Sequence, residues 1–152
     1  MAVKLTAKGR GLFKNDYELS ADGKPLTSWD ANSLRSGGSF SLDGRTYEVK
    51  ANMLATQWEL TDETGMPVAV TERVGRKNWT ITSGGRTYAF ERASIFRLEE
   101  RLIVDGRAAG SIRRKYLHSD VSHADLPGLP APIQVFAFMV SLSGWDLAAD
   151  AG

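Results

Sequence analysis

Short segments in which apolar and polar residues alternate fill most of the chain. SFSLDGRTYEV at 39–49 and WTITSGGRTYAF at 79–90 show this alternation on both sides of a central turn. A period of two places successive side chains on opposite faces of a strand, so each segment predicts a β-hairpin with one buried face. Both contain Gly-Arg-Thr-Tyr. Two explanations are open: an internal repeat of two hairpins, or the shared chemistry of the turn. Similar patterns predict strands over about residues 2–117.

Turn-forming dipeptides separate these segments at regular intervals. Asp-Gly or Gly-Gly pairs end at Gly23, Gly44, Gly85 and Gly106, and DETG places Gly65 in the remaining gap. Both central residues of a type I′ hairpin turn need positive φ, which these pairs adopt readily. The glycines lie 20 or 21 residues apart, which is the length of two strands with their turns. The spacing therefore predicts a meander of about twelve strands, either closed into a barrel or folded into two packed sheets.

The apolar run PAPIQVFAFMVSLSGWDLAA at 130–149 has a different pattern. Its first residues overlap HADLPGLPAP at 123–132, whose three prolines and one glycine end the strand pattern. Placed on an α-helix, its apolar side chains cover the whole circumference, so the helix has to be surrounded by protein or by lipid. The side chains are those of Ile133, Val135, Phe136, Ala137, Phe138, Met139, Val140, Leu142 and Trp145.

The length of this run favours a protein environment. A transmembrane helix needs about 20 predominantly apolar residues. The apolar part of this run covers only 133–147 and contains several polar residues. We therefore expect no transmembrane span, and a hydrophobic helix at about 131–145 enclosed by a closed antiparallel barrel of about twelve strands. The alternative is a helix that lies against one face of an open sheet.

The elements in this order resemble the tubby C-terminal fold, in particular its small LURP-one-related branch, to which phospholipid scramblases are related. The resemblance covers about residues 10–147. It rests on YEL at Tyr17, GRTYEV followed by TQWELTDETGMPVAVTER, WTITSGGRTYAFER, GSIRRKY, and ADLPGL before the terminal helix. It implies an all-β barrel around a buried C-terminal helix. It also implies a non-enzymatic module that binds phosphoinositide or another anionic lipid through basic side chains on the barrel exterior.

The chain lacks several sequence features of the phospholipid scramblases, the relatives named in this resemblance. Scramblases carry proline-rich and palmitoylated cysteine segments and an acidic calcium loop, whereas this chain has no cysteine and its TDETG segment is a short turn. Scramblase activity is therefore not expected. The alternative functions are a protein interaction or structural domain with no lipid role, and a barrel that stores a small apolar ligand or releases its helix into a membrane.

Composition narrows the class of protein. With 152 residues, of which 42% are hydrophobic and 24% charged, the chain is expected to form a single folded domain over residues 1–152. The absence of cysteine excludes disulfides and thiolate sites. The first residues show no secretory pattern, so we expect a cytoplasmic protein. If it binds lipid, we expect it at the membrane surface.

Basic residues concentrate in the middle of the chain. The net charge is +1, but residues 71–117 hold 11 Lys and Arg against 5 Asp and Glu. Near an anionic membrane each basic side chain contributes about 1 kcal/mol, so the basic clusters are candidates for a headgroup site. The alternative is an ordinary solvated strand edge. Because the overall charge is balanced, no nucleic-acid partner is expected. The two clusters are Arg73, Arg76 and Lys77, and Arg113, Arg114 and Lys115.

The most metal-like string is HSDVSH, with His118, Asp120 and His123. In a strand, His118 and Asp120 would point to one face and His123 to the other, so the three side chains would converge only across a bend. We therefore interpret them as structural residues near the entry into the helix, and expect no metal and no cofactor.

Enzymatic chemistry has little support in the sequence. There is no cysteine and no Gly-x-Ser-x-Gly motif for nucleophilic catalysis. Adjacent carboxylates such as Glu99-Glu100 and Asp62-Glu63 would face opposite sides of a strand, whereas acid–base catalysis needs two groups that converge on a substrate. The chain is therefore expected not to be an enzyme. The tryptophans are interpreted as core residues, with a ligand cavity or a membrane-interface belt as the alternative: Trp29, Trp58, Trp79 and Trp145.

Overall fold

The computed structural model describes residues 4–10, 16–31, 36–94, 97–115 and 121–151. Within these ranges, twelve strands precede one helix. The strands are β1 (Lys4–Arg10), β2 (Asp16–Ala21), β3 (Lys24–Ala31), β4 (Gly37–Leu42), β5 (Arg45–Ala51), β6 (Trp58–Thr61), β7 (Pro67–Glu72), β8 (Asn78–Ser83), β9 (Arg86–Ser94), β10 (Arg97–Val104), β11 (Arg107–Arg114) and β12 (Val121–Asp125), and the helix is α1 (Ala131–Ala151).

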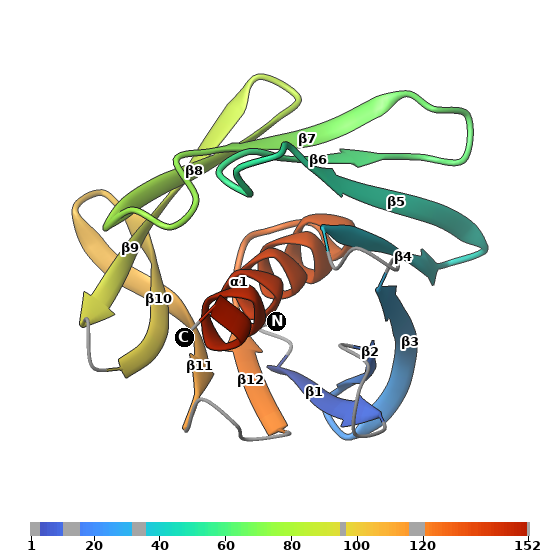
Figure 1. Cartoon of the computed structure of the whole chain (residues 1–152), viewed down its shortest axis with the longest axis horizontal. Helices are drawn as coiled ribbons and strands as arrows, with labels where there is room; N and C mark the ends of the chain where they lie inside the picture. Colours follow the sequence, from blue (N-terminus) through green and yellow to red (C-terminus); the bar gives the residue numbers. More distant parts are fainter. Residues whose placement is uncertain (1–3, 11–15, 32–35, 95–96, 116–120, 152) are drawn as a thin grey trace.

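The strands form one closed barrel. Each strand pairs antiparallel with its neighbours in sequence, and β1 closes the sheet by pairing with β12 from Lys4↔Asp125 to Lys8↔Val121. Figure 1 looks along the helix and shows the strands on all sides of it. The expected antiparallel barrel with a C-terminal helix is thus confirmed, and the two packed sheets and the open sheet are not what the chain forms.

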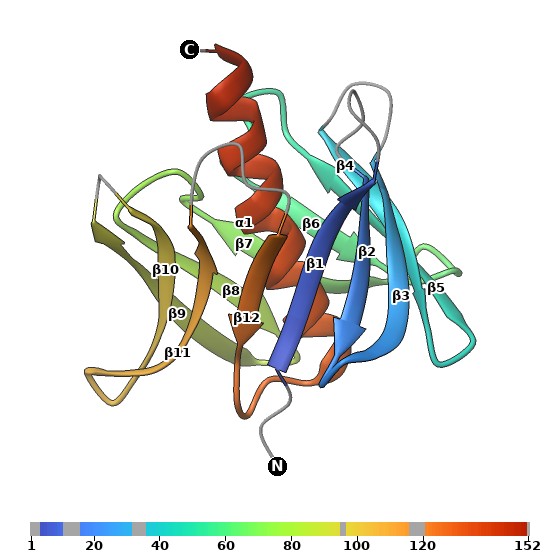
Figure 2. The same cartoon turned by 90° about the horizontal axis from the view of Figure 1, so that it is seen from below.

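The tight turns all lie at one end of the barrel. Asp22-Gly23, Asp43-Gly44, Gly84-Gly85 and Asp105-Gly106 have positive φ at both residues, as the predicted type I′ turns require. Because consecutive antiparallel strands turn at alternate ends, the strand ends that lead from one hairpin to the next lie at the other end, where α1 also finishes (Figure 2). We call this end the exit end. Its fully described connections are residues 52–57 and 73–77.

The helix provides the centre of the hydrophobic core. Trp29, Trp58 and Phe90, which point inward from the strands, are buried against the same cluster. Since strands enclose α1 on all sides, the helix can be apolar all round, as the sequence pattern predicts. At most 2% of each of these helical residues is exposed: Ile133, Val135, Phe136, Ala137, Phe138, Met139, Val140 and Leu142.

Two boundaries differ from the expectation. The strands continue past residue 117 with β12, because Ser122 and Ala124 alternate inward and the prolines begin only at Pro127. The helix continues to Ala151 rather than to about residue 145, since the last residues, DLAADA, include alanines that favour a helix.

The longer helix changes the argument about membrane spanning. By length and composition, the window Ala131–Ala148 resembles a membrane span, and 56% of that window is buried inside the barrel. Length therefore does not exclude a span, contrary to the sequence-based argument. The burial of the helix is accounted for by the protein itself.

Candidate functional site

Polar side chains occupy several inward positions toward the exit end. Tyr17, Glu100, Arg114 and Ser122 are buried although they lie inside an otherwise apolar barrel. They form two groups, both next to Trp145 of α1: Arg114 lies 5.9 Å from the centre of the Trp145 ring, and Trp145 also interacts with Glu100. The last turns of α1 are thus held by polar contacts, whereas the earlier turns are held by apolar packing.

The first group joins four elements around Arg114. The Arg114 guanidinium donates to Asp146 Oδ1 of α1 at 2.6 Å, to the Tyr17 hydroxyl of β2 at 2.6 Å and to Ser122 Oγ of β12 at 3.0 Å. Tyr17 in turn donates to Asp146 Oδ2 at 2.5 Å. We call these four residues the helix lock, because they fix the end of α1 to the barrel wall.

The helix lock corrects the interpretation of Arg114. Only 4% of this residue is exposed, and its charge is paired with Asp146, so it does not belong to an exterior basic patch. Burial and the charge of Asp146 raise the pKa of Tyr17 far above its usual value. Burial lowers the pKa of Arg114, but its interactions with Tyr17 and Asp146 outweigh this effect and raise it overall. Both groups therefore keep their protons.

The second group surrounds Glu100 of β10. Trp79 Nε1 donates to Glu100 Oε1 at 2.8 Å, and only 5% of Glu100 is exposed. Burial raises the pKa of this carboxyl, although hydrogen bonds from Trp79 and Trp145 and the charge of Arg92 partly oppose it. The adjacent Glu99 instead forms an ion pair with Arg101 at 3.0 Å. One carboxylate is buried and the other paired elsewhere, so they do not converge on a common substrate.

Glu100 should give the protein a characteristic pH dependence. In the unfolded chain this carboxyl loses its proton near the ordinary glutamate pKa, whereas in the folded protein it holds the proton to higher pH. Rising pH therefore favours the unfolded state between these two values. We expect the free energy of unfolding of the parent to fall relative to that of Glu100→Gln as the pH rises above about 4. Urea unfolding of both proteins at a series of pH values measures this difference, and parallel pH profiles would contradict the assignment.

A cavity of about 490 Å³ opens beside the last turns of α1. Its walls come from the helix, from β8, β9 and β10, and from the two loops of the exit end. Most of the wall is apolar, with Glu100 and two arginines as its charged members. It is lined by Leu54, Ala55, Thr56, Val74, Gly75, Arg76, Trp79, Arg92, Glu100, Val140, Ser141, Gly144, Trp145, Leu147 and Ala148.

Gly144 keeps this cavity open on the helix side. A methyl group added at its Cα would meet no atom within 4 Å. Glycine inside a helix is less favourable than alanine by about 1 kcal/mol, and no close contact within the described structure requires glycine here. The absence of a side chain at this position therefore enlarges the cavity at some cost in helix stability.

The loop 52–57 holds two apolar side chains in solvent. Met53 and Leu54 are 102% and 81% exposed. The loop itself is well ordered by hydrogen bonds: Asn52 Oδ1 accepts from the backbone N–H groups of Thr56 and Gln57 at 2.9 and 3.2 Å. Exposed apolar side chains on an ordered loop with a polar surround are typical of an interaction surface.

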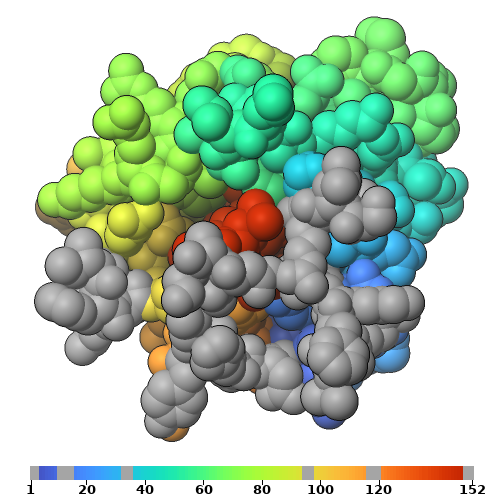
Figure 3. Space-filling model, viewed as in Figure 1, coloured from blue at the N-terminus to red at the C-terminus, as the bar shows by residue number. Residues whose placement is uncertain are grey.

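A basic loop is joined to the loop that carries Met53 and Leu54. The backbone N–H of Val74 donates to Thr56 O at 2.9 Å, which ties residues 73–77 to residues 52–57. Arg73, Arg76 and Lys77 are all exposed. Arg73 and Arg76 line a cleft of about 650 Å³ together with Leu54. Figure 3 looks onto this end, where the end of α1 lies beside the 52–57 loop.

The second predicted cluster lies elsewhere on the same end. Arg113 is exposed on the outer face of β11, opposite Glu99 and His123 in the sheet register, and Lys115 is also exposed. Strands β8, β9 and β10 separate β11 from β7, the strand that leads into the basic loop. The structure therefore brings together Arg73, Arg76 and Lys77, but does not merge them with Arg113 and Lys115.

The metal-like string is only partly described. His118 and Asp120 lie outside the described residues. His123 is exposed, its Nδ1 lies 3.4 Å from Thr6 Oγ1, and partial burial together with the charges of Lys4 and Arg113 lowers its pKa. Among the residues that the structure describes, no group of three His, Cys, Asp or Glu side chains has a geometry that could hold a metal ion.

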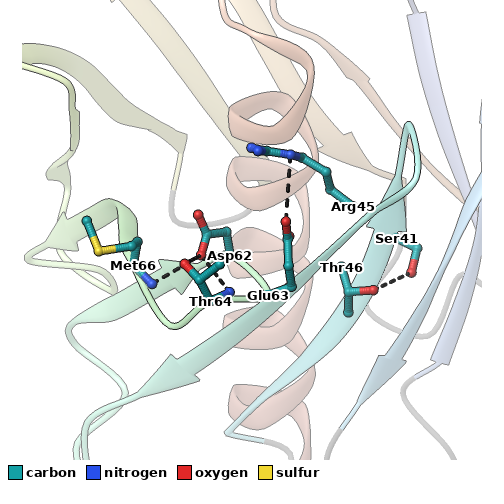
Figure 4. A network of polar contacts seen from close by, with 7 residues as sticks. All are labelled: Ser41, Arg45, Thr46, Asp62, Glu63, Thr64 and Met66. Atoms are coloured by element: carbon teal, nitrogen blue, oxygen red, sulfur yellow. Dashed lines mark hydrogen bonds and ion pairs between the residues drawn. The ribbon is translucent and has the colours of Figure 1, made fainter.

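A cleft of about 610 Å³ on the outer side of β5 and β6 carries carboxylates. Its polar network stabilises a turn (Figure 4): Asp62 Oδ1 accepts from the Thr64 N–H and hydroxyl and from the Met66 N–H, at 2.6 to 3.1 Å. These hydrogen bonds, led by that of the Thr64 hydroxyl, lower the pKa of Asp62. Glu63 lies 3.8 Å from Arg45. Asp62 and Glu63 therefore have a structural role in the hairpins.

Several of the residues that build the exit end were not singled out in the sequence. Met53 and Leu54 look like core residues by type, and only their position in a loop distinguishes them. Glu100 stands out in the sequence only as the neighbour of Glu99, although its position two residues from Leu102 makes it face the same way as that core residue. Gly144 had no signal, since a glycine in an apolar helix does not reveal what lies opposite it.

Comparison with known proteins adds no identification. No protein-family model matches the chain, and no characterised protein gives a significant match to its sequence.

Proposed function

We propose that this chain is a non-enzymatic module of the tubby C-terminal-like, LURP-one-related class, and that its exit end binds the surface of an anionic membrane. The closed barrel around a hydrophobic helix supports the class. The proposed location is the cytoplasmic face of a membrane. The observation that carries the proposal is the pair Met53 and Leu54, exposed on an ordered loop beside Arg73, Arg76 and Lys77.

The two kinds of side chain would contribute in different ways. Fully burying a Met or Leu side chain contributes about 1.5–3 kcal/mol. Each basic side chain near an anionic surface contributes about 1 kcal/mol, and salt reduces this contribution. Two apolar side chains with three adjacent basic ones therefore favour a surface that is apolar at depth and negatively charged outside, which describes an anionic bilayer.

Vesicle flotation tests this proposal. The parent is expected to float with vesicles that contain phosphatidylserine or phosphatidylinositol bisphosphate, and not with pure phosphatidylcholine vesicles. We expect Met53→Ser with Leu54→Ser to weaken binding at least about tenfold, since roughly 1.4 kcal/mol corresponds to each factor of ten. Arg73→Ser, Arg76→Ser and Lys77→Ser together should weaken it to a similar extent at low salt and less at high salt.

A charge-matched control separates the site from the net charge. Arg45, Arg86 and Arg107 are exposed and lie next to the tight turns at the opposite end. Changing these three to serine removes the same charge, so binding should stay close to that of the parent. Equal loss in both triple variants would show that the exit end is not the binding face. If the protein binds neither vesicle type, the lipid role is refuted and the protein interaction alternative is favoured.

A further inference from the structure

The cavity beside the last turns of α1 has features of a ligand site. We propose that it binds one single-chain acidic amphiphile, with the acidic group at Arg76 and Arg92 and the chain along α1. This inference goes beyond membrane binding: it concerns a single molecule held inside the protein and does not need a bilayer.

The cavity has the size and the lining of a small-molecule site. Its volume of about 490 Å³ lies in the range of roughly 300–1,000 Å³ that such sites have. Val74, Val140 and Leu147 form an apolar wall, and Trp145 adds a large flat surface. Next to this wall, the missing side chain of Gly144 leaves open space. An alkyl chain fits such a surface because it needs no hydrogen bonds.

The polar groups of the cavity favour an acidic ligand. Arg92 donates from one terminal nitrogen to Gly75 O at 2.7 Å, its only side-chain hydrogen bond within the described part of the chain. A guanidinium has five N–H donors, so Arg92 keeps donors for a ligand. Arg76 is exposed on the loop that contains Gly75. Two arginines on neighbouring segments match the two oxygens of a carboxylate or a phosphate ester.

The single carboxylate of the cavity is already engaged. Glu100 accepts from Trp79 Nε1 at 2.8 Å and interacts with Trp145, and only 5% of it is exposed. A cationic amphiphile would find this carboxylate almost fully covered and would also face Arg76 and Arg92. We therefore assign the site to an anion rather than to an amine.

Three ligands with the same chain and different headgroups test this assignment. Dodecanoate, dodecanol and dodecyltrimethylammonium are titrated into the full chain below their aggregation limits, without vesicles, by isothermal titration calorimetry. Dodecyl phosphate, as a further arm, distinguishes a carboxylate from a phosphate ester. We expect saturable binding of one dodecanoate or one dodecyl phosphate, weaker binding of dodecanol, and the weakest binding of the ammonium compound. Preference for the ammonium compound, or no saturable binding of any ligand, would overturn the proposal.

Variants locate the binding in the cavity. Gly144→Leu places a side chain in the open space and should weaken dodecanoate binding at least tenfold, whereas Ala131→Leu, on the exposed first turn of α1, should not. Arg92→Gln should weaken the binding of dodecanoate but not of dodecanol, and Arg86→Gln at the opposite end serves as its control. Equal affinity of parent and Gly144→Leu would place the ligand elsewhere and refute the proposal.

Two further measurements distinguish loss of cavity binding from misfolding of a variant and from loss of membrane binding. Thermal unfolding of each variant shows that it is folded. Vesicle flotation of Gly144→Leu shows whether membrane binding persists, since Met53 and Leu54 are unchanged in that variant. Loss of dodecanoate binding with flotation retained would support the cavity. The opposite pattern in Met53→Ser alone, a residue that does not line the cavity, would support the membrane surface independently.

Discussion

Replacing Asp146 with alanine is expected to lower the free energy of unfolding by about 3–5 kcal/mol, because it leaves the buried charge of Arg114 without its counter-ion. The contact between Arg114 and Asp146 is 2.6 Å long, and the Arg114 side chain is 2% exposed. The Tyr17 hydroxyl also loses the acceptor to which it donates. Equilibrium unfolding in urea, followed by circular dichroism, gives the free energy of each protein.

A double variant separates the charge from the packing. Arg114→Met combined with Asp146→Leu removes both charges and keeps most of the buried volume, so we expect it to recover most of the stability lost in Asp146→Ala. Ser122→Ala removes only one acceptor, 3.0 Å from Arg114, and should cost about 1 kcal/mol. A loss below about 1 kcal/mol in Asp146→Ala would show that the helix lock does not hold the end of α1.

Replacing Phe138 with alanine should also cost about 3–5 kcal/mol, the range for removing a buried aromatic ring. Phe138 is 0% exposed at the centre of the barrel. A strand wall joined by hydrogen bonds on every side gives the surrounding residues little room to move into the space left by the ring. The same unfolding experiment measures the loss.

A partly exposed residue of the same helix provides the comparison. Leu147 is only half-buried and lies beside the open cavity, so Leu147→Ala should cost clearly less than Phe138→Ala. If both substitutions had equal and small effects, the helix would not be the packed centre of the protein, and the account of its apolar circumference would fail.

Most of the architecture can be predicted from short-range signals in the sequence. Asp-Gly and Gly-Gly pairs determine the turns because few other residues adopt positive φ, and their even spacing determines the strand length. An apolar circumference indicates an enclosed helix. The sequence does not indicate the helix end at Ala151, because the last turn consists of alanine and aspartate and adds no large apolar side chain. It does not indicate β12 either, because this strand is short and lies just before a proline-rich segment.

The candidate site was less predictable, because it depends on which way each side chain points. The sequence predicts one basic cluster of Arg113, Arg114 and Lys115, yet alternation along β11 turns only Arg114 inward, on the same side as Ile112. The cavity brings together residues from three strands, two loops and the helix, such as Arg92 and Gly144. No local sequence pattern indicates which distant segments meet in space, so the cavity can be recognised only in the folded barrel.

The order of elements has a consequence for how the protein is made. All twelve strands precede α1 in the chain, and the barrel closes by pairing β1 with β12. During translation, the inward faces of the strands therefore leave the ribosome before the helix that covers them. A nascent barrel presents unpaired edges until β12 is made and an uncovered apolar lining until α1 follows, and both features promote aggregation. Completion of this fold must therefore come after synthesis of the helix, and a chain interrupted before it should depend on chaperones.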